Sequence, residues 1–164
     1  MPSPRPEDAE RGFIVPIGGA EDKVADKIVL RKFAELSGGE DGHIVIIPTA
    51  SQLEDTGDRY VEVFSELGIG STDVFRISER EDANCADRVS RLQKATGIFM
   101  TGGNQLRLST ILGGTDVATH IRRLNAKGVH IGGTSAGAAF MSEHMIAYGA
   151  EGSTPKGGMV TLAP

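Results

Sequence analysis

The most informative motif in the sequence is Gly133-Thr134-Ser135-Ala136-Gly137, which follows the mainly apolar run 129–131. Gly-x-Ser-x-Gly is the pattern of a nucleophile elbow, where a strand ends, the chain turns sharply and a helix begins. Glycines suit this turn because a Cβ would collide with the neighbouring strand or helix. The Ser135 hydroxyl would project at a helix N-terminus, which favours developing negative charge. The motif predicts a serine hydrolase with Ser135 as nucleophile; a merely structural turn is the alternative.

Upstream of this motif, apolar runs alternate with amphipathic segments. We expect strands over residues 12–19, 43–48, 73–77, 97–100 and in the run that precedes the motif. We expect helices over residues 22–36, 53–67, 82–95, 104–112 and 115–126. Strands and helices that alternate with short loops predict an α/β fold, with a mostly parallel sheet and helices on both faces.

The length and composition indicate one domain of ordinary polarity. The chain has 164 residues and a formal net charge of -5 that is spread along the sequence, so nothing favours nucleic-acid binding. Cys85 is the single cysteine, which excludes an intrachain disulfide. No run approaches the roughly 20 apolar residues of a membrane span, and we expect a cytoplasmic location. Residues 1–11 are expected to form a flexible lead-in to a domain over 12–164.

Four glycine-rich or polar turns follow the expected strands. They lie at residues 18–19, 48–51 and 101–105 and at the Ser135 motif itself. The carboxyl ends of parallel strands lie at one edge of the sheet, where such proteins bind ligands. We therefore expect these four stretches to meet around Ser135. Glu21 and Asp22, which follow the first turn, are interpreted as the acidic start of a helix.

A serine nucleophile needs two donors that hold the oxyanion of its tetrahedral intermediate. The backbone amide of Ala136 would be one, and the amide of Gly103, or alternatively of Asn104, would be the other. Asn104, Gln105 and Ser51 are the candidates for contact with substrate. The structural alternatives are helix caps for Asn104 and Ser51 and an exposed position in the first turn of a helix for Gln105.

The histidines of the chain offer no evident base for Ser135. His43 and His130 belong to expected strands, and His120 belongs to an expected helix. His144 would lie about 13 Å from Ser135 along the axis of the helix that follows the motif, if that helix extended so far. No histidine pairs with an acidic residue at a spacing typical of metal ligands, so no metal site is expected.

Four motifs together carry a family resemblance. They are Gly18-Gly19-Ala20-Glu21-Asp22-Lys23, Ile47-Pro48-Thr49-Ala50-Ser51, Thr101-Gly102-Gly103-Asn104-Gln105 and Gly133-Thr134-Ser135-Ala136-Gly137-Ala138. With these motifs the chain resembles the cyanophycinases, which are serine exopeptidases of the α-aspartyl dipeptidase family. The likeness runs in order from about Gly12 to Pro164 and includes the segments 145–149 and 159–164.

The resemblance implies a three-layer, flavodoxin-like fold related to class I glutamine amidotransferases, with a serine in place of their cysteine. It implies cleavage of cyanophycin, a polyaspartate that carries an arginine on each side-chain carboxyl, into β-Asp-Arg dipeptides. It also implies a dimer that works without metal or organic cofactor. The nucleophile of the family corresponds to Ser135, and its substrate-contacting glutamine corresponds to Gln105.

The chain departs from the family in one respect. Relatives continue well past the position of Pro164, and that part carries the catalytic histidine, its acidic partner and groups that hold the arginine of the substrate. We expect a companion polypeptide from a cleaved or split protein to supply the base. A catalytically weak relative and an incomplete chain are the alternatives to that arrangement. An exopeptidase for short Asp-containing peptides and a non-catalytic binding protein are the alternative functions.

Overall fold

The computed structural model describes residues 3–149 and 160–163. The strands are β1 (Ile14–Ile17), β2 (His43–Ile47), β3 (Ser71–Val74), β4 (Gly97–Met100), β5 (His130–Thr134), β6 (Met145–Gly149) and β7 (Val160–Ala163). The α-helices are α1 (Ile28–Leu36), α2 (Thr56–Glu66), α3 (Ala86–Leu92), α4 (Gln105–Leu112), α5 (Asp116–Ala126) and α6 (Ala136–Phe140). The 3-10 helices are η1 (Gly39–Asp41) and η2 (Asp82–Asn84).

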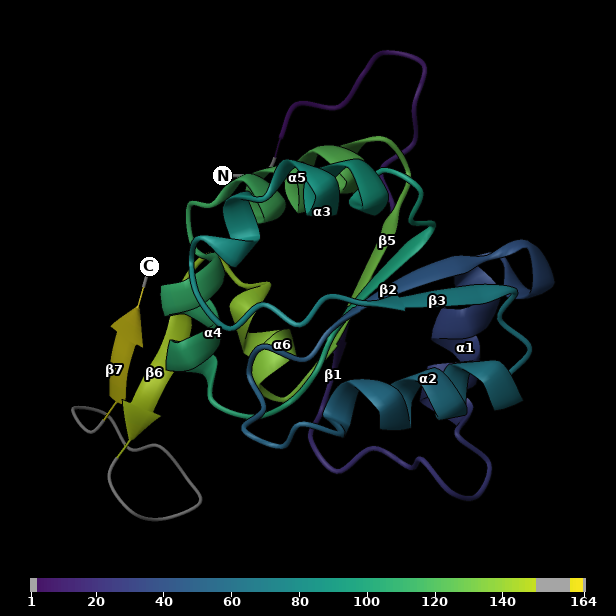
Figure 1. Ribbon diagram of the computed structural model, residues 1–164, viewed down its shortest axis with the longest axis horizontal. Helices are drawn as coiled ribbons and strands as arrows, with labels where there is room; N and C mark the ends of the chain where they lie inside the picture. The colour runs from purple at the N-terminus through teal and green to yellow at the C-terminus, as the bar shows by residue number, and fades with distance from the viewer. Residues whose placement is uncertain (1–2, 150–159, 164) are drawn as a thin grey trace.

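Five parallel strands form the central sheet in the order β1-β5-β4-β2-β3. Figure 1 shows α1 and α2 on one face of this sheet and α3 and α5 on the other. The predicted three-layer, flavodoxin-like α/β fold is therefore confirmed. The chain steps outward from β2 to β3 and then continues on the other side of β2 with β4. Ligands of such sheets bind beside this change of direction, at the carboxyl ends of the strands.

Strand β2 shows how one apolar run fills both sides of the sheet. Val45 and Ile47 belong to a core with α3, α4 and α5, whereas Ile44 and Ile46 belong to a second core with α1 and α2. The reason is that successive side chains of a strand point to opposite faces. All four side chains are fully buried, and each such burial stabilises the fold by roughly 1.5–3 kcal/mol.

The first helix begins later than predicted, at Ile28 rather than at Asp22. The carboxylate of Asp22 accepts hydrogen bonds from the backbone N–H groups of Val24, Ala25 and Lys27, at 2.9, 2.9 and 3.0 Å. These bonds pair three backbone N–H groups with a side chain, so residues 22–27 form a loop instead of the first turns of a helix. The interpretation of Asp22 as part of a helix start is therefore wrong.

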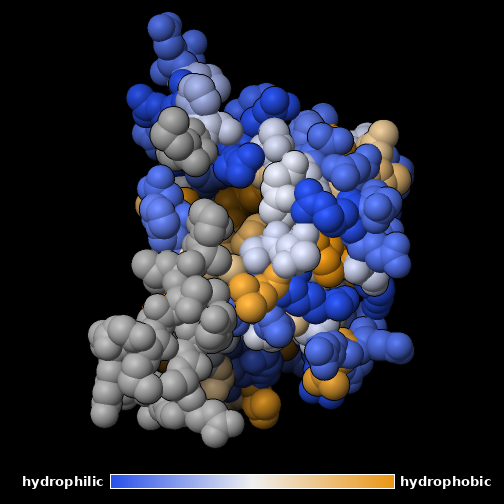
Figure 2. Space-filling view, turned by 90° about the vertical axis from the view of Figure 1, so that its left-hand side faces the viewer, coloured by the Kyte–Doolittle hydropathy of each residue, from blue (hydrophilic) through white to orange (hydrophobic). Residues whose placement is uncertain are grey.

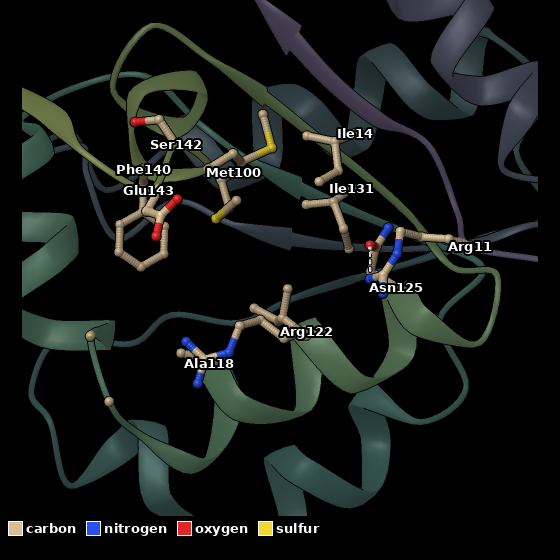
Figure 3. Close-up of a pocket in the computed structure, with 14 residues that line it drawn as sticks. Arg11, Ile14, Met100, Ala118, Arg122, Asn125, Ile131, Phe140, Ser142 and Glu143 are labelled. Atoms are coloured by element: carbon tan, nitrogen blue, oxygen red, sulfur yellow. Dashed lines mark hydrogen bonds between the residues drawn. The ribbon is translucent and has the colours of Figure 1, made fainter. Parts of the chain in front are cut away.

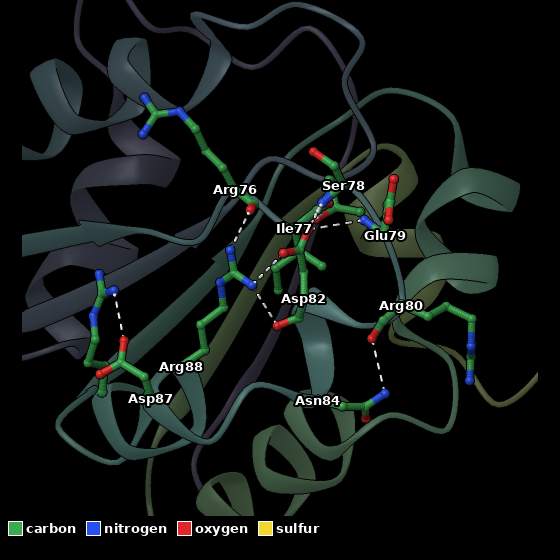
Figure 4. Close-up of polar contacts among 11 residues, drawn as sticks. Arg76, Ile77, Ser78, Glu79, Arg80, Asp82, Asn84, Asp87 and Arg88 are labelled. Atoms are coloured by element: carbon green, nitrogen blue, oxygen red, sulfur yellow. Dashed lines mark hydrogen bonds and ion pairs between the residues drawn. The ribbon is translucent and has the colours of Figure 1, made fainter.

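The third strand also differs from its prediction, since β3 covers 71–74 and not 73–77. The segment that follows β3 is held by side chains instead of by a strand ladder (Figure 4). Arg88 donates to the carbonyl and carboxylate of Asp82 and to the carbonyl of Arg76, at 2.7, 2.9 and 3.1 Å. The other carboxylate oxygen of Asp82 accepts from two backbone N–H groups. The predicted helix 82–95 is accordingly split into η2 and the shorter α3.

Strands β6 and β7 form a separate antiparallel pair that the sequence did not predict (Figure 1). Of the segments that carry the family resemblance, β6 coincides with 145–149 and β7 with 160–163. Met159 and Pro164 lie outside the described residues.

Arg11 connects the N-terminal segment to the domain. One nitrogen of its guanidinium donates to the carbonyl of Ser3 at 2.6 Å, and another donates to the Asn125 side chain on α5 at 3.1 Å. The flexibility expected of residues 1–11 stays a prediction.

Strand β1 forms one edge of the sheet and carries exposed hydrophobic side chains. Phe13, directly before it, and Ile14 are 61% and 53% exposed. Beside this edge lies a cavity of about 610 Å³, whose apolar lining includes Ile14, Met100, Ile131 and Phe140 (Figure 3). Figure 2 shows a hollow with hydrophobic side chains on the face turned toward the viewer. Among the described residues, no strand pairs with the outer side of β1.

Candidate active site

Ser135 lies between the end of β5 and the start of α6, at the carboxyl edge of the sheet. Its backbone has φ 49° and ψ -108°, a conformation that costs residues with a Cβ about 1–3 kcal/mol. The Ser135 N–H donates to the carbonyl of Ile17 at 3.0 Å, and its carbonyl accepts from the N–H of Ala139 at 2.9 Å. Neighbouring structure thus fixes a strained turn, on which the serine is exposed.

Two glycines of the motif make this turn possible. A Cβ on Gly133 would lie 2.6 Å from the backbone of Gly137, and a Cβ on Gly137 would lie 2.2 Å from the carbonyl oxygen of Met100. Both distances are far below van der Waals contact. Helix α6 packs against β4 and β5 only because these positions lack side chains, which confirms the predicted role of the glycines.

The loops that follow β1, β2, β4 and β5 line one cavity of about 360 Å³, as the sequence predicted. Gly19, Ser51, Gly102, Gly103 and Ser135 represent the four loops in its lining. The loop after β1 comes close to the serine, since a Cβ built on Gly19 would lie 3.5 Å from the Ser135 Oγ. Ser135 therefore opens onto a hollow to which all four of these loops contribute.

Gly103 and Ala136 are the two candidates for the oxyanion hole. Gly103 has φ 142°, and a Cβ there would lie 2.1 Å from the carbonyl oxygen of Ala50, so only glycine fits. Ala136 directly follows Ser135 at the start of α6. Within residues 3–149, neither backbone N–H has a hydrogen-bond acceptor. Neither donor is thus committed to another group there, although Ala136 itself is buried. Their function as an oxyanion hole stays a prediction.

Glu21 is a component of this site that its sequence context did not predict. Its carboxylate accepts hydrogen bonds from the hydroxyls of Thr134 and Tyr60 and forms an ion pair with Lys23 at 2.6 Å. The Glu21 side chain is only 4% exposed. Because Thr134 directly precedes Ser135, this carboxylate attaches the loop after β1 to the strained turn. The interpretation of Glu21 as a helix start is wrong, since α1 begins at Ile28.

The environment of Glu21 favours its ionised form. Burial raises the pKa of Glu21, but the hydrogen bonds from Lys23, Thr134 and Tyr60 outweigh it and lower that pKa overall. Burial, together with the adjacent Glu21 carboxylate, raises the pKa of the Tyr60 hydroxyl. Glu21 therefore remains an acceptor and Tyr60 a donor at neutral pH. An acid close to a lysine after a strand-ending glycine pair is the sequence signal that could have revealed this network.

The three predicted substrate-contacting side chains occupy different surroundings. Ser51 lines the cavity, where its hydroxyl lies 2.7 Å from that of the first residue of α2. Asn104 caps α4, because its side chain accepts from an N–H of the first turn at 3.0 Å. Gln105 donates to the carbonyl of Ile146 on β6 at 3.2 Å, and neither it nor Asn104 lines the cavity. Their contact with substrate stays a prediction.

None of the four histidines lines the Ser135 cavity in the described part of the chain. His43 and His130 are the first residues of β2 and β5, at the opposite ends of these strands from the cavity. Burial lowers the pKa of His130, whose Nδ1 accepts from the N–H of Phe13 at 2.9 Å. His120 lies on α5, and His144 lies beyond α6, which already ends at Phe140. The distance expected for His144 along that helix therefore does not apply.

The loop held by Asp22 gives a pH-dependent prediction. Backbone N–H groups, first that of Lys27, lower the pKa of Asp22 from 3.8 to about 2. Since the folded pKa is depressed, the stabilisation is complete above the unfolded pKa, about pH 4, and is lost as pH falls through about 2. We expect Asp22→Asn to be less stable than the unchanged protein at pH 5 and equally stable near pH 1. Urea unfolding across this range measures the difference; one that persists near pH 1 contradicts the prediction.

The fold and the turn at Ser135 together define an α/β protein built around a serine nucleophile elbow. Comparison with known proteins agrees with this class. The chain belongs to Peptidase family S51, whose model matches residues 14–158.

Two curated relatives are cyanophycinases. This chain is 46% identical over 156 residues to the cyanophycinase of Geminocystis herdmanii, covering 93% of the chain and 57% of the relative. It is 41% identical over 155 residues to that of Synechococcus elongatus, covering 93% and 48%. The chain thus spans about half the length of the curated relatives it matches. A crystal structure of a peptidase from an acI-B1 Actinobacterium has the same fold, with a TM-score of 0.70 and 22% identity over 83% of this chain and 59% of that one.

Two further properties bear on the function. Among the described residues, no three histidine, cysteine, aspartate or glutamate side chains cluster as metal ligands would. The helices in that part of the chain are too short or too polar to cross a membrane.

Proposed function

We propose that this chain is the nucleophile-bearing part of a serine exopeptidase that hydrolyses cyanophycin to β-Asp-Arg dipeptides. The observation that carries the proposal is Ser135, exposed on a strained turn with φ 49° and facing a cavity formed by four loops. The sequence identity to two cyanophycinases supports the substrate. The function requires no metal or organic cofactor.

In the proposed reaction, the Oγ of Ser135 attacks the carbonyl carbon of the scissile amide. The proton of the hydroxyl passes to a base, and the carbonyl oxygen becomes an oxyanion held by the N–H groups of Gly103 and Ala136. Collapse of this intermediate breaks the C–N bond, and the base returns the proton to the leaving amine. Water then hydrolyses the acyl-enzyme and restores Ser135.

We infer that the base is a histidine from a companion polypeptide that completes the domain. Two observations support this inference: no described histidine lines the cavity, and no strand of the described residues pairs with the outer side of β1. Exposed Phe13 and Ile14 beside the 610 Å³ cavity suit a partner that covers this edge. The completed unit forms a dimer and works in the cytoplasm, without nucleic acid or membrane as partner.

A comparison of substrates tests the proposed activity. We expect the complete protein to release β-Asp-Arg from cyanophycin and to hydrolyse Asp-Xaa dipeptides at least about tenfold less efficiently, in kcat/KM, because the polymer offers more contacts to the site. Liquid chromatography of the products measures both rates. A preference for the dipeptides would favour an exopeptidase for short Asp-containing peptides. Hydrolysis of neither would favour a binding protein.

A further inference from the structure

Two cations in the Ser135 cavity have no part in the reaction derived above. Lys23, from the loop after β1, and Arg59, from α2, line the cavity together with Ser135. Glu21 is the single acidic residue in the described lining, and Asp55, the partner of Arg59, lies outside it. Glycines, alanine, hydroxyl-bearing side chains and the Tyr60 ring make up the remainder. The lining beside the nucleophile therefore presents two cationic side chains to an anionic group.

Lys23 is both anchored and accessible. Its Nζ lies 2.6 Å from a Glu21 carboxylate oxygen and 5.4 Å from the centre of the Tyr60 ring, and its side chain is 35% exposed. An ammonium group has three N–H donors. One serves the Glu21 carboxylate, and the Glu21 carbonyl is a distant second acceptor at 3.5 Å. The group thus retains capacity for an acceptor in the cavity, while Glu21 fixes its position.

Arg59 is likewise held by an acidic neighbour and accessible from solvent. Its Nε donates to a carboxylate oxygen of Asp55 at 2.9 Å, and one terminal nitrogen forms an ion pair with the same oxygen at 2.8 Å. A guanidinium has five N–H donors in a planar fork that matches a carboxylate. The pair with Asp55 leaves donors of Arg59 for a second carboxylate. The Arg59 side chain is 64% exposed, so such a group can reach it from solvent.

We propose that Lys23 and Arg59 form a carboxylate-binding subsite that positions an acidic end of the substrate beside Ser135. The inference rests on the proposed function, because cyanophycin presents carboxylates both at the end of its aspartate backbone and on its arginines. The same positive charge repels a guanidinium, so this subsite excludes the basic part of the substrate. Glu21 keeps Lys23 oriented and does not itself contact substrate.

Binding to the complete protein that carries Ser135→Ala tests this subsite without any turnover. The probe is the dipeptide β-Asp-Arg, and isothermal titration calorimetry measures its affinity. We expect Lys23→Met and Arg59→Met each to weaken binding about tenfold, as expected for loss of one charge-assisted contact. Lys32→Met is the matched control, because Lys32 is an exposed cation paired with Glu35 on α1 and lies outside the cavity. Lys23→Arg, which keeps the positive charge, should retain most of the affinity that Lys23→Met loses.

Two amidated probes identify the carboxylate that binds. Amidation of the aspartyl α-carboxylate, or instead of the arginyl carboxylate, should remove most of the affinity for whichever group occupies the subsite. Equal affinity of both amides and of the unmodified dipeptide, or no binding of the dipeptide at all, would overturn the proposal. If the Lys23 variants fail to fold, Arg59→Met still tests the subsite, because it removes only an exposed ion pair.

The subsite and the proposed activity fail separately. If the complete protein hydrolyses cyanophycin with an unchanged KM in both methionine variants, the subsite is wrong and the proposed function stands. If cyanophycin is not hydrolysed but both variants lose the affinity for β-Asp-Arg, the subsite stands and the proposed function is wrong.

Discussion

Replacing Ser135 with alanine is expected to reduce hydrolysis of cyanophycin by the complete protein at least about 10⁴-fold, because the acyl-enzyme can no longer form. The fold should not change. The Ser135 side chain is exposed, and the turn is held by backbone hydrogen bonds to Ile17 and Ala139 that alanine also makes. Product release measured by chromatography gives the activity, and thermal unfolding gives the stability.

A matched serine separates loss of the nucleophile from loss of a hydroxyl. Ser90 is an exposed serine on α3, and it lines neither the Ser135 cavity nor the 610 Å³ cavity. Ser90→Ala should therefore retain the rate of the unchanged protein. Activity of Ser135→Ala equal to that of Ser90→Ala would show that Ser135 is not the nucleophile.

Replacing Gly137 with alanine is expected to destabilise the protein by about 1–3 kcal/mol, although alanine is usually the better helix former by about 1 kcal/mol. The new Cβ would lie 2.2 Å from the carbonyl oxygen of Met100, which is backbone in β4 and has no freedom to move aside. Helix α6 would have to shift away from the sheet, and Ser135 would shift with it. Urea unfolding measures the loss of stability.

Gly18→Ala is the control for this effect. A Cβ on Gly18 would meet no atom within 4 Å, although Gly18 lies on the same rim as the nucleophile. We expect its free energy of unfolding to stay within about 0.5 kcal/mol of that of the unchanged protein. A Gly137→Ala protein as stable as the Gly18→Ala protein would contradict the packing of α6 on β4.

The layered fold could be predicted because its cause is local. The run 43–47 is apolar at every position after His43, which is typical of a strand buried on both faces. Its four aliphatic side chains do divide between two cores. The bounds of helices and strands were less predictable where the hydrogen bonds of one side chain outweigh the hydrophobic pattern. Asp22 captures three backbone amides and delays α1, and Asp82 with Arg88 holds a segment that has the composition of a strand.

The site could be predicted where a glycine allows two backbone segments to approach closely. It could not be predicted where side chains far apart in the sequence come together. Gly103 and Gly137 each approach a carbonyl oxygen too closely for a Cβ, so their sequence positions carry structural information. Tyr60 and Arg59 give no such signal, because they occupy an ordinary amphipathic helix and reach the cavity only through the packing of α2 on the sheet. Glu21 was assigned to a helix because its hydrogen-bond partners lie far along the chain.

We propose that Ser135 is a nucleophile activated by a base that the described residues do not contain. The measurement that tests this activation is intact mass spectrometry of the purified protein after treatment with a fluorophosphonate, which reacts with activated serines. We expect one adduct, located on Ser135 and missing from Ser135→Ala, in a preparation that also contains a histidine-bearing companion polypeptide. An adduct on another serine, or an unlabelled Ser135 in a preparation that hydrolyses cyanophycin, would contradict this proposal.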